Sequence, residues 1–231
     1  MLKTAKIIPG AKSSAASAER IRAIVACLEE DIALGRLRPR ERLIEEDLAL
    51  RFSAKRHVIR QVLIELQGMG IIVRQRNKGA AVRDFSSDEV EHIYAVRAIL
   101  EGKAAQLIPL PNPPLVAELR RIQKRRVLAV HKSDLRAVFR ENLLFHKALF
   151  RACGNPSLVE AIDIFALKTH SIRSLPIGNP KLRAQLTADH GAIIEALAGC
   201  DRAKFVRRVV DHLLPSKKMY LELHERIAGG E

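Results

Sequence analysis

The stretch Ala54-Lys55-Arg56-His57-Val58-Ile59-Arg60-Gln61-Val62-Leu63-Ile64-Glu65-Leu66 decides the fold of the N-terminal part of this chain. Its basic side chains gather in the first turns, and apolar residues follow at helical spacing. A turn, Phe52-Ser53-Ala54, separates it from a second short amphipathic helix at about residues 45–51. Two short helices joined by a tight turn, the second with a basic start, predict a helix-turn-helix that places its second helix in the major groove of DNA.

A basic hairpin is predicted directly after this motif. Ile71-Ile72-Val73 and Ala80-Ala81-Val82-Arg83 read as two short strands, and the turn between them contains Asn77 and Gly79, which tolerate positive φ angles. The alternative, a surface-charged helix beside a plain hairpin, does not predict this order of elements. The sequence therefore predicts a winged helix-turn-helix. The side chains expected to contact DNA are Lys55, Arg56, His57 and Arg60 on the helix, and Arg74, Arg76 and Lys78 on the wing.

The charge of the chain favours a polyanionic partner. The formal net charge is +14 over 231 residues. Residues 1–85 hold 17 Lys and Arg against 10 Asp and Glu, and residues 86–231 hold 23 against 16, so each part has a surplus of 7. The positive charge is thus denser in the smaller N-terminal part. Charge alone would also suit a sequence-neutral nucleoid or RNA-binding protein.

The cysteines and the apolar runs indicate the compartment. The three cysteines are Cys27, Cys153 and Cys200, and no CxxC motif occurs. This argues against a disulfide framework or a zinc ribbon and suits a reducing cytoplasm. No apolar run approaches the length of a membrane span, and we expect residues 1–17 to form a flexible basic arm rather than a signal peptide.

The chain is predicted to be mainly α-helical, with two domains after the arm. Residues 18–84 form the winged helix-turn-helix with its small β-hairpin wing, opened by a helix at about 18–34. Residues 85–231 read as helix after helix, with no alternating strand pattern, which predicts an all-α bundle. We expect Pro215 to kink the last helix just after His212. The predicted bundle helices span about 88–108, 114–131, 134–152, 156–173 and 181–198, followed by the last helix after Asp201.

Two sets of residues carry a resemblance to a known family. Residues 21–82 resemble the winged helix-turn-helix of GntR-family transcription factors, through Gly35-Arg36-Leu37-Arg38-Pro39, Leu43, Glu45, Asp47-Leu48-Ala49, Arg56, Arg60, Leu63, Leu66, Gly70 and Gly79. The rest resembles the ligand-sensing helical domain of the FadR-type subgroup, called FCD. Its carriers are Tyr94-Ala95-Val96-Arg97-Ala98-Ile99-Leu100-Glu101, Phe145-His146, Gly154-Asn155-Pro156, His190 with Ile194 and Ala196, and His212-Leu213.

The sequence also departs from the family pattern at several positions of the winged part. Arg40 stands where the family usually has Gly, and Glu46 stands where relatives often carry a DNA-contacting Arg. His57-Val58 replaces the usual Thr-Pro, and the Gly and Ser usual in the turn are Ser53 and Lys55 here. The fold should tolerate these changes, but the operator sequence should not be inherited from relatives. Arg56 and Arg60 match family residues that reach bases or phosphates.

A set of polar residues is predicted to converge inside the bundle. Asn142 and His146 are four residues apart and share a helix face, whereas His190 and His212 lie among apolar residues of two later helices. Three imidazoles and one oxygen suit Zn²⁺, Ni²⁺, Mn²⁺ or a similar divalent ion. The alternative is that each is a hydrogen-bonded core histidine. The FCD resemblance implies the metal site, with Asn142 in place of the family's common Asp.

The neutral Asn142 carbonyl should bind metal more weakly than a carboxylate and should leave more positive charge to attract an anionic effector. The resemblance also implies that Arg97 faces the effector cavity; the alternative is an exposed ion pair with Glu101 four residues on.

Together these features predict a cytoplasmic, non-enzymatic transcriptional regulator. We expect it to bind a palindromic double-stranded DNA operator as a homodimer and to sense a small organic acid near a bound divalent metal. The alternative is a metal-dependent enzyme with a nucleic-acid-binding appendage, although no HExxH motif occurs.

Overall fold

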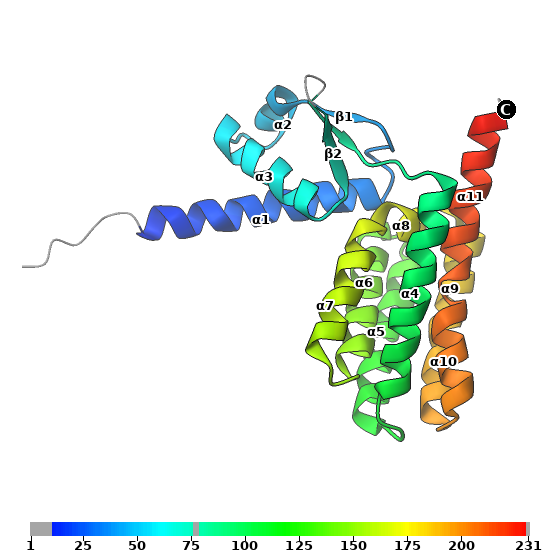
Figure 1. The fold of residues 1–231 in the computed structure, drawn as a ribbon. Coiled ribbons are helices and arrows are strands. Elements are labelled where there is room, and N and C mark those ends of the chain that lie inside the picture. The colour runs from blue at the N-terminus through cyan, green and yellow to red at the C-terminus, as the bar shows by residue number, and fades with distance from the viewer. Residues whose placement is uncertain (1–10, 76–78, 230–231) are drawn as a thin grey trace, which may run out of the picture.

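The computed structural model, which describes residues 11–75 and 79–229, consists of a small winged part and a helical bundle (Figure 1). The first helix, α1 (Ala11–Ala33), is long and runs under the winged part to the bundle. It begins earlier than the predicted residue 18, so it extends into the segment predicted as a flexible arm. Residues 1–10 of that arm lie outside the described residues.

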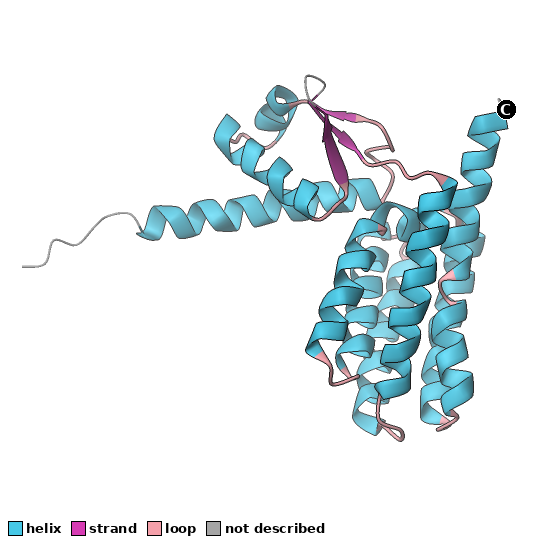
Figure 2. Cartoon of the chain, in the orientation of Figure 1, coloured by secondary structure: helices cyan, strands magenta, loops and turns pink. Residues whose placement is uncertain are grey.

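The winged part contains the predicted helix-turn-helix and wing. α2 (Glu45–Arg51) and α3 (Arg56–Gly68) form the two short helices. The strands are β1 (Arg42–Leu43), β2 (Ile72–Gln75) and β3 (Gly79–Val82), in the antiparallel order β1-β3-β2 (Figure 2). The predicted hairpin is confirmed by the pairing of Val73 with Ala81. β1 was not predicted, because two residues are too few to show an alternating pattern.

The apolar stripe of α3 forms the centre of the winged core, as its spacing predicts. Ile59, Val62 and Leu66 are fully shielded from solvent, and Leu63 is almost so. They pack against the stripe of α1 around Leu28 and against the strands. Because this face is held in the core, the opposite face of α3, with its basic residues, must point outward.

The bundle helices are punctuated by capping residues. Ser86 and Glu89 form a reciprocal capping box at the start of the first bundle helix, and Asn112, Asp134, Asn155, Asn179 and Asp201 each accept a backbone N–H at the start of another. These caps explain why most predicted boundaries agree with the structure. The helices are α4 (Ser87–Leu107), α5 (Pro113–His131), α6 (Leu135–Arg151), α7 (Pro156–Lys168), α8 (His170–Gly178), α9 (Pro180–Ala198), α10 (Arg202–Asp211) and α11 (Leu214–Gly229).

Two predicted helices of the bundle differ in the structure. The helix predicted over 156–173 is two helices, α7 and α8, which meet at Thr169. The Thr169 hydroxyl donates to the carbonyl of Phe165 at 2.8 Å, a side-chain bond that competes with regular helical bonding. The predicted kink after His212 is a complete break, and Pro215 lies in the first turn of α11, where its missing N–H costs nothing.

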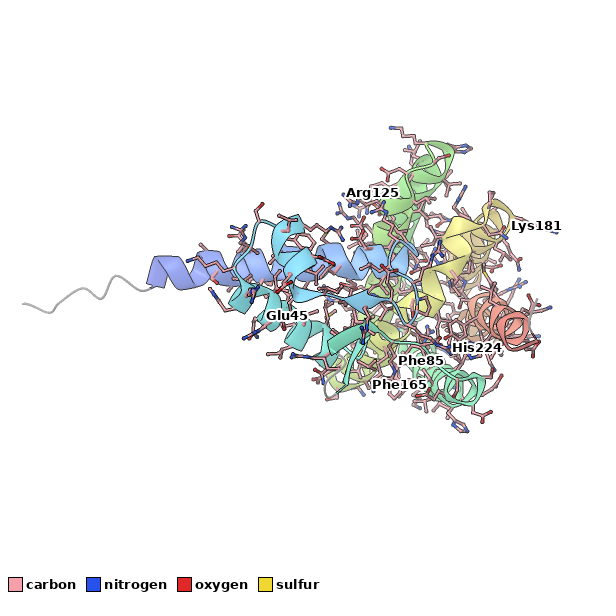
Figure 3. The ribbon with its side chains drawn as sticks, turned by 90° about the horizontal axis from the view of Figure 1, so that it is seen from above. Glu45, Phe85, Arg125, Phe165, Lys181 and His224 are labelled. Carbon is pink, nitrogen blue, oxygen red and sulfur yellow. The ribbon has the colours of Figure 1, made fainter. Side chains whose placement is uncertain are left out.

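Contacts from α1 and α11 join the winged part to the bundle. Glu30 of α1 is buried and accepts from Arg136 and Arg140 of α6, and Ala33 packs with the bundle residue Ile177. On the other side, the last helix reaches the segment that leads from the wing into α4, where Figure 3 labels Phe85 and His224. The orientation of the winged part is therefore fixed by two separate elements.

Candidate functional site

One face of the winged part carries the predicted DNA-contacting side chains. Lys55 precedes the first turn of α3, and Lys55, Arg56, His57 and Arg60 are all exposed. Arg74 is exposed on β2. Arg76 and Lys78, also predicted to contact DNA, lie outside the described residues. The structure therefore brings the five described basic residues to the surface of one motif whose recognition helix has its apolar side in the core.

Acidic residues of α2 lie against this basic face, an arrangement that was not predicted from the sequence. Arg56 pairs with Glu46, and Arg60 pairs with Glu45. The signal was present as three consecutive acidic residues, 45–47, at the start of the first motif helix. A carboxylate there can serve the helix dipole alone, so only the structure shows that two of the three are paired with arginines.

The second candidate site is a buried cluster of three histidines in the bundle. His146, His190 and His212 come from α6, from α9 and from the residue after α10, and their nearest ligand atoms all lie within 4.8 Å of one another. The Nε2 atoms of His190 and His212 are 3.1 Å apart. The predicted convergence of these three side chains in the bundle core is thus present in the structure.

The surroundings of the cluster keep its imidazoles neutral. The ring of His190 stacks on Phe145 with a centroid distance of 3.9 Å, and His190 has no solvent-exposed surface. Burial lowers the pKa of His146 and of His190 well below the usual value, and nearby positive groups lower both further. Burial also lowers the pKa of His212, although Asp189 opposes this shift. Neutral imidazole is the form that binds metal ions.

The donor set fits a divalent metal. Two facing Nε2 atoms can share only one hydrogen, whereas a cation accepts both lone pairs. Among the described residues, the Nδ1 atoms of His146, His190 and His212 have no hydrogen-bond partner, and Asp189 Oδ2 lies 3.9 Å from His212 Nδ1. A carboxylate behind a ligating histidine is a common arrangement. Asn142 lines the small cavity beside His146 and His212.

Three buried or half-buried arginines surround the histidines, and only Arg97 was predicted from the sequence. Arg97 lines the cavity together with Arg173, and Arg126 lies behind the cluster, where its charge lowers the pKa of His190. Burial lowers the pKa of Arg126 and of Arg173 to about 10, so both stay charged at neutral pH. Arg126 follows Lys124 and Arg125 in a basic run that reads as a solvated surface, which is why it was missed.

Arg97 combines parts of its two predicted roles. It pairs with Glu101 at 2.8 Å, but both side chains are only 3% exposed, so the prediction of an exposed pair was wrong. The reason is that both residues lie in the interior of the bundle, where neighbouring helices cover them. Burying a pair in this way requires good geometry, and a further contact joins Arg97 Nη1 to the Thr169 hydroxyl at 3.4 Å.

Two cavities of very different size meet at His212. The inner cavity, beside Asn142 and His146, has a volume of about 20 Å³, enough for about one water molecule. A groove of about 690 Å³ lies between α9, α10 and α11 and is also lined by His212 and Asp189. The wall of the groove contains apolar residues and charges of both signs, among them Arg208, Lys218, Asp211 and Glu222. A ligand in the groove would therefore reach the histidine cluster from outside.

Two family models match parts of this chain. Residues 20–82 match the model of the gntR family of bacterial regulatory proteins, and residues 92–214 match the FCD domain. The gluconate operon transcriptional repressor of Bacillus subtilis is 26% identical over 173 residues, which cover 71% of this chain and 70% of that protein. The transcriptional regulator McbR of Escherichia coli is 25% identical over 137 residues, which cover 59% of this chain and 62% of McbR.

The fold of a solved relative is also similar. The structure of McbR (YncC) from E. coli superposes with a TM-score of 0.73 and 19% identity, covering 89% of this chain and 98% of that one. This likeness concerns the fold. In the described part of the chain, no helix combines the length and the apolar character that crossing a membrane requires.

The depressed pKa values of the histidines predict that acid destabilises the metal-free bundle. An unfolded chain takes up protons on His146 and His190 as the pH falls below about 6.5, whereas the folded chain does not, so stability falls with pH in that range. The loss is up to about 1.4 kcal/mol per histidine and pH unit. Melting temperatures measured in the presence of a chelator between pH 7.5 and 5.5 should show this fall in stability. His190→Asn should reduce the dependence, whereas the exposed His92→Asn should not; equal slopes in all three proteins would contradict the assignment.

Proposed function

Because the chain belongs to the GntR family of bacterial regulatory proteins and carries an FCD domain, we propose that it is a DNA-binding transcriptional regulator whose operator affinity responds to a small organic acid bound near a divalent metal in the bundle. The observation that carries the sensing part is the buried site itself: three neutral imidazoles and three arginines gathered next to helices that contact the winged part. Burying polar groups costs free energy, so a bundle core with a purely structural role would not be expected to contain this many of them.

We assign operator binding to the exposed face of α3 and to the wing. Lys55, Arg56, His57 and Arg60 enter the major groove, and Arg74, with Arg76 and Lys78 of the wing, lies along the phosphates. The support is the exposure of all described members of this set on one motif. Base contacts by Arg56 or Arg60 would give sequence preference, whereas phosphate contacts would give affinity alone.

We further propose that the chain works as a homodimer on a palindromic operator. An apolar stripe on the outer face of α4 supports this: Val96, Ile99 and Leu107 are at least 37% exposed, and Ile99 reaches 71%. Ile164 of the neighbouring α7 is 47% exposed. Contiguous exposed apolar side chains of this kind are characteristic of association surfaces. A twofold dimer would present two recognition helices to two half-sites.

In the bundle, we assign His146, His190 and His212 as metal ligands and Asn142 as a weaker oxygen ligand. A bound dication would supply a Lewis-acidic positive charge at the cavity. Arg97 and Arg173 add two positive charges, while Glu101 pairs with Arg97 and Asp189 lies 3.9 Å from His212 Nδ1. The resulting positive field selects an anionic ligand, which supports a carboxylate effector.

The size of the inner cavity implies that the effector binds with some opening of the bundle. About 20 Å³ cannot hold an organic acid, whereas the outer groove of about 690 Å³ can. Both are lined by His212, which lies in the break between α10 and α11. We propose that the acid enters from the groove and that α11 shifts to admit its carboxylate.

α11 also gives a route from this site to the winged part. Ser216 lines the inner cavity, and one turn later Tyr220 is buried at the domain junction. The Phe85 backbone N–H donates to the Tyr220 hydroxyl at 2.9 Å, and that hydroxyl donates to Asp84 at 2.8 Å. Asp84 in turn pairs with Arg40, which precedes β1. A shift of α11 would therefore change the orientation of the winged part and the spacing of the two DNA-binding heads.

The assignment of α3 predicts that Arg60→Ala weakens operator binding strongly while the fold stays intact. A lost base contact should cost about 1–3 kcal/mol and relax sequence preference, whereas a lost phosphate contact should lower affinity for every duplex and flatten the salt slope. Titrations of an in vitro selected operator and of a scrambled duplex measure both. Arg120→Ala on α5 is the matched control. Unchanged affinity of the Arg60 variant for both duplexes would refute the assignment.

The metal assignment predicts that Zn²⁺, Ni²⁺ or Mn²⁺ raises the melting temperature and that a chelator reverses the effect. At about one hundred times its dissociation constant, a bound ion stabilises the folded state by about 2.7 kcal/mol. His190→Ala should abolish the shift, and the exposed His92→Ala should keep it. Asn142→Asp should tighten metal binding, because it adds a negative charge to the ligand set. The same charge should weaken the binding of an anionic effector. Absence of a shift with all three metals would leave the residues as core histidines.

The route through α11 predicts that Tyr220→Phe uncouples the two domains. The variant should still bind operator and should still be stabilised by the most effective member of a panel of C2–C6 carboxylic acids. The acid-dependent change of operator affinity should shrink several-fold, because the contact to Asp84 and Phe85 is lost. Lys217→Gln removes a different contact of α11, the ion pair with Glu91 of α4, which does not reach the winged part, and serves as the control. Full coupling in the Tyr220 variant would exclude this route.

A further inference from the structure

The first turn of α2 places carboxylates directly against the arginines of the DNA-binding face. Glu46 Oε1 lies 2.8 Å from Arg56 Nη2, and Glu45 Oε2 lies 2.9 Å from Arg60 Nε. The other oxygen of Glu45 lies 3.9 Å from Arg74 Nη2 on β2. Figure 3 labels Glu45 on the winged part. In the free protein, therefore, three of the described cations expected to meet DNA already face a carboxylate.

The two glutamates differ in what they do for the fold. Glu45 is 28% exposed and bridges α3 to the wing, so it helps to hold the motif together. Glu46 and Arg56 are 70% and 66% exposed, and the pair joins two helices that already pack through buried Leu48 and Ile59. An ion pair this exposed contributes little to stability. The helix dipole favours negative charge in this turn, but Glu45 and Asp47 already supply it, so the fold does not require a carboxylate at residue 46 in particular.

A carboxylate on a DNA-facing surface acts against DNA affinity. Glu46 repels nearby phosphates, and it removes Arg56 from the set of cations that any duplex attracts. Glu46 affects a contact between Arg56 and a base differently. Arg56 donates to Glu46 only through Nη2, so most of its guanidinium N–H groups stay available for the base. An arginine whose side chain is held in one place pays less entropy when it forms a bidentate contact with a base edge.

We propose that Glu46 is a specificity-determining residue: by holding Arg56 in place, it suppresses binding to arbitrary DNA and favours a duplex that offers Arg56 a base edge. The proposal rests on the proposed function, in which α3 enters the major groove. Glu46 acts through Arg56 and is thus a positioning residue, not a direct contact. Of the two possible roles of Arg56, a contact to a base or a contact to a phosphate, the proposal therefore assigns the contact to a base.

The test compares Glu46→Gln with wild type on two probes, the in vitro selected operator and a scrambled duplex of the same length, at several salt concentrations. Removal of the carboxylate should raise affinity for the scrambled duplex several-fold and steepen its salt slope by about one, because Arg56 becomes one more phosphate contact. Operator affinity should rise less or fall. The ratio of the two affinities should therefore drop.

Three further variants isolate the mechanism. Glu46→Asp retains the charge and should restore most of the discrimination. Asp47→Asn removes a neighbouring exposed charge from the same helical turn, and Asp47 has no ion-pair partner among the described residues, so it should leave the ratio unchanged. In an Arg56→Ala background, Glu46→Gln should lose its effect on the salt slope, because the coupled partner is absent.

The outcomes distinguish this inference from the proposed function. If wild-type protein shows no operator preference, the assignment of α3 fails, and the role of Glu46 fails with it. If wild type prefers its operator but Glu46→Gln leaves the affinity ratio unchanged, only the role of Glu46 is refuted. It is also refuted if Glu46→Gln lowers operator affinity alone with no change on the scrambled duplex, since Glu46 would then read a base itself.

Discussion

The structure depends on one helix, α1, that belongs to two packed cores at once. Leu28 is fully buried in the winged core, and Ala33, one and a half turns later, packs against Ile177 in the bundle. Between them, the buried carboxylate of Glu30 takes two arginines from α6. A buried carboxylate without partners is strongly unfavourable, so these contacts tie the winged part to the helix that also carries His146. The recognition helix is therefore mechanically linked to the polar site.

The core of the bundle contains polar side chains at positions where most helical bundles have apolar ones. His146, His190, Arg97 and Arg126 are buried among apolar residues such as Phe145. The histidines avoid the cost by staying neutral, and Arg97 is compensated by Glu101. What remains is a positively charged cavity that an anionic ligand would neutralise. The anionic effector that we propose would neutralise part of this buried charge, and its binding would favour the arrangement of the surrounding helices that holds it best.

Much of the fold follows from short-range signals in the sequence. The boundaries of α2 and α3 follow from an apolar stripe next to a basic start, and those of the bundle helices from Asn, Asp and Ser caps. The convergence of His146, His190 and His212 was predictable from polar residues at apolar positions and from the family pattern. The break at Thr169 was not predictable, because it depends on a hydroxyl that bonds the carbonyl of Phe165 in place of regular helix. The burial of Arg126 and the pairing of Glu46 with Arg56 depend on tertiary packing, which local patterns do not contain.

The central claim is that the bundle site and the DNA-binding face are energetically coupled, and reciprocal linkage tests it most directly. The carboxylic acid that most stabilises the metal-loaded protein should first be titrated into free protein and into protein saturated with operator. Operator affinity should then be measured with and without saturating acid. If the two sites are coupled, the affinity for the acid and the affinity for the operator should change by the same factor, about 5–150-fold for typical allosteric proteins. If the acid binds at the histidine site and neither affinity changes, the two sites are independent and the account is contradicted.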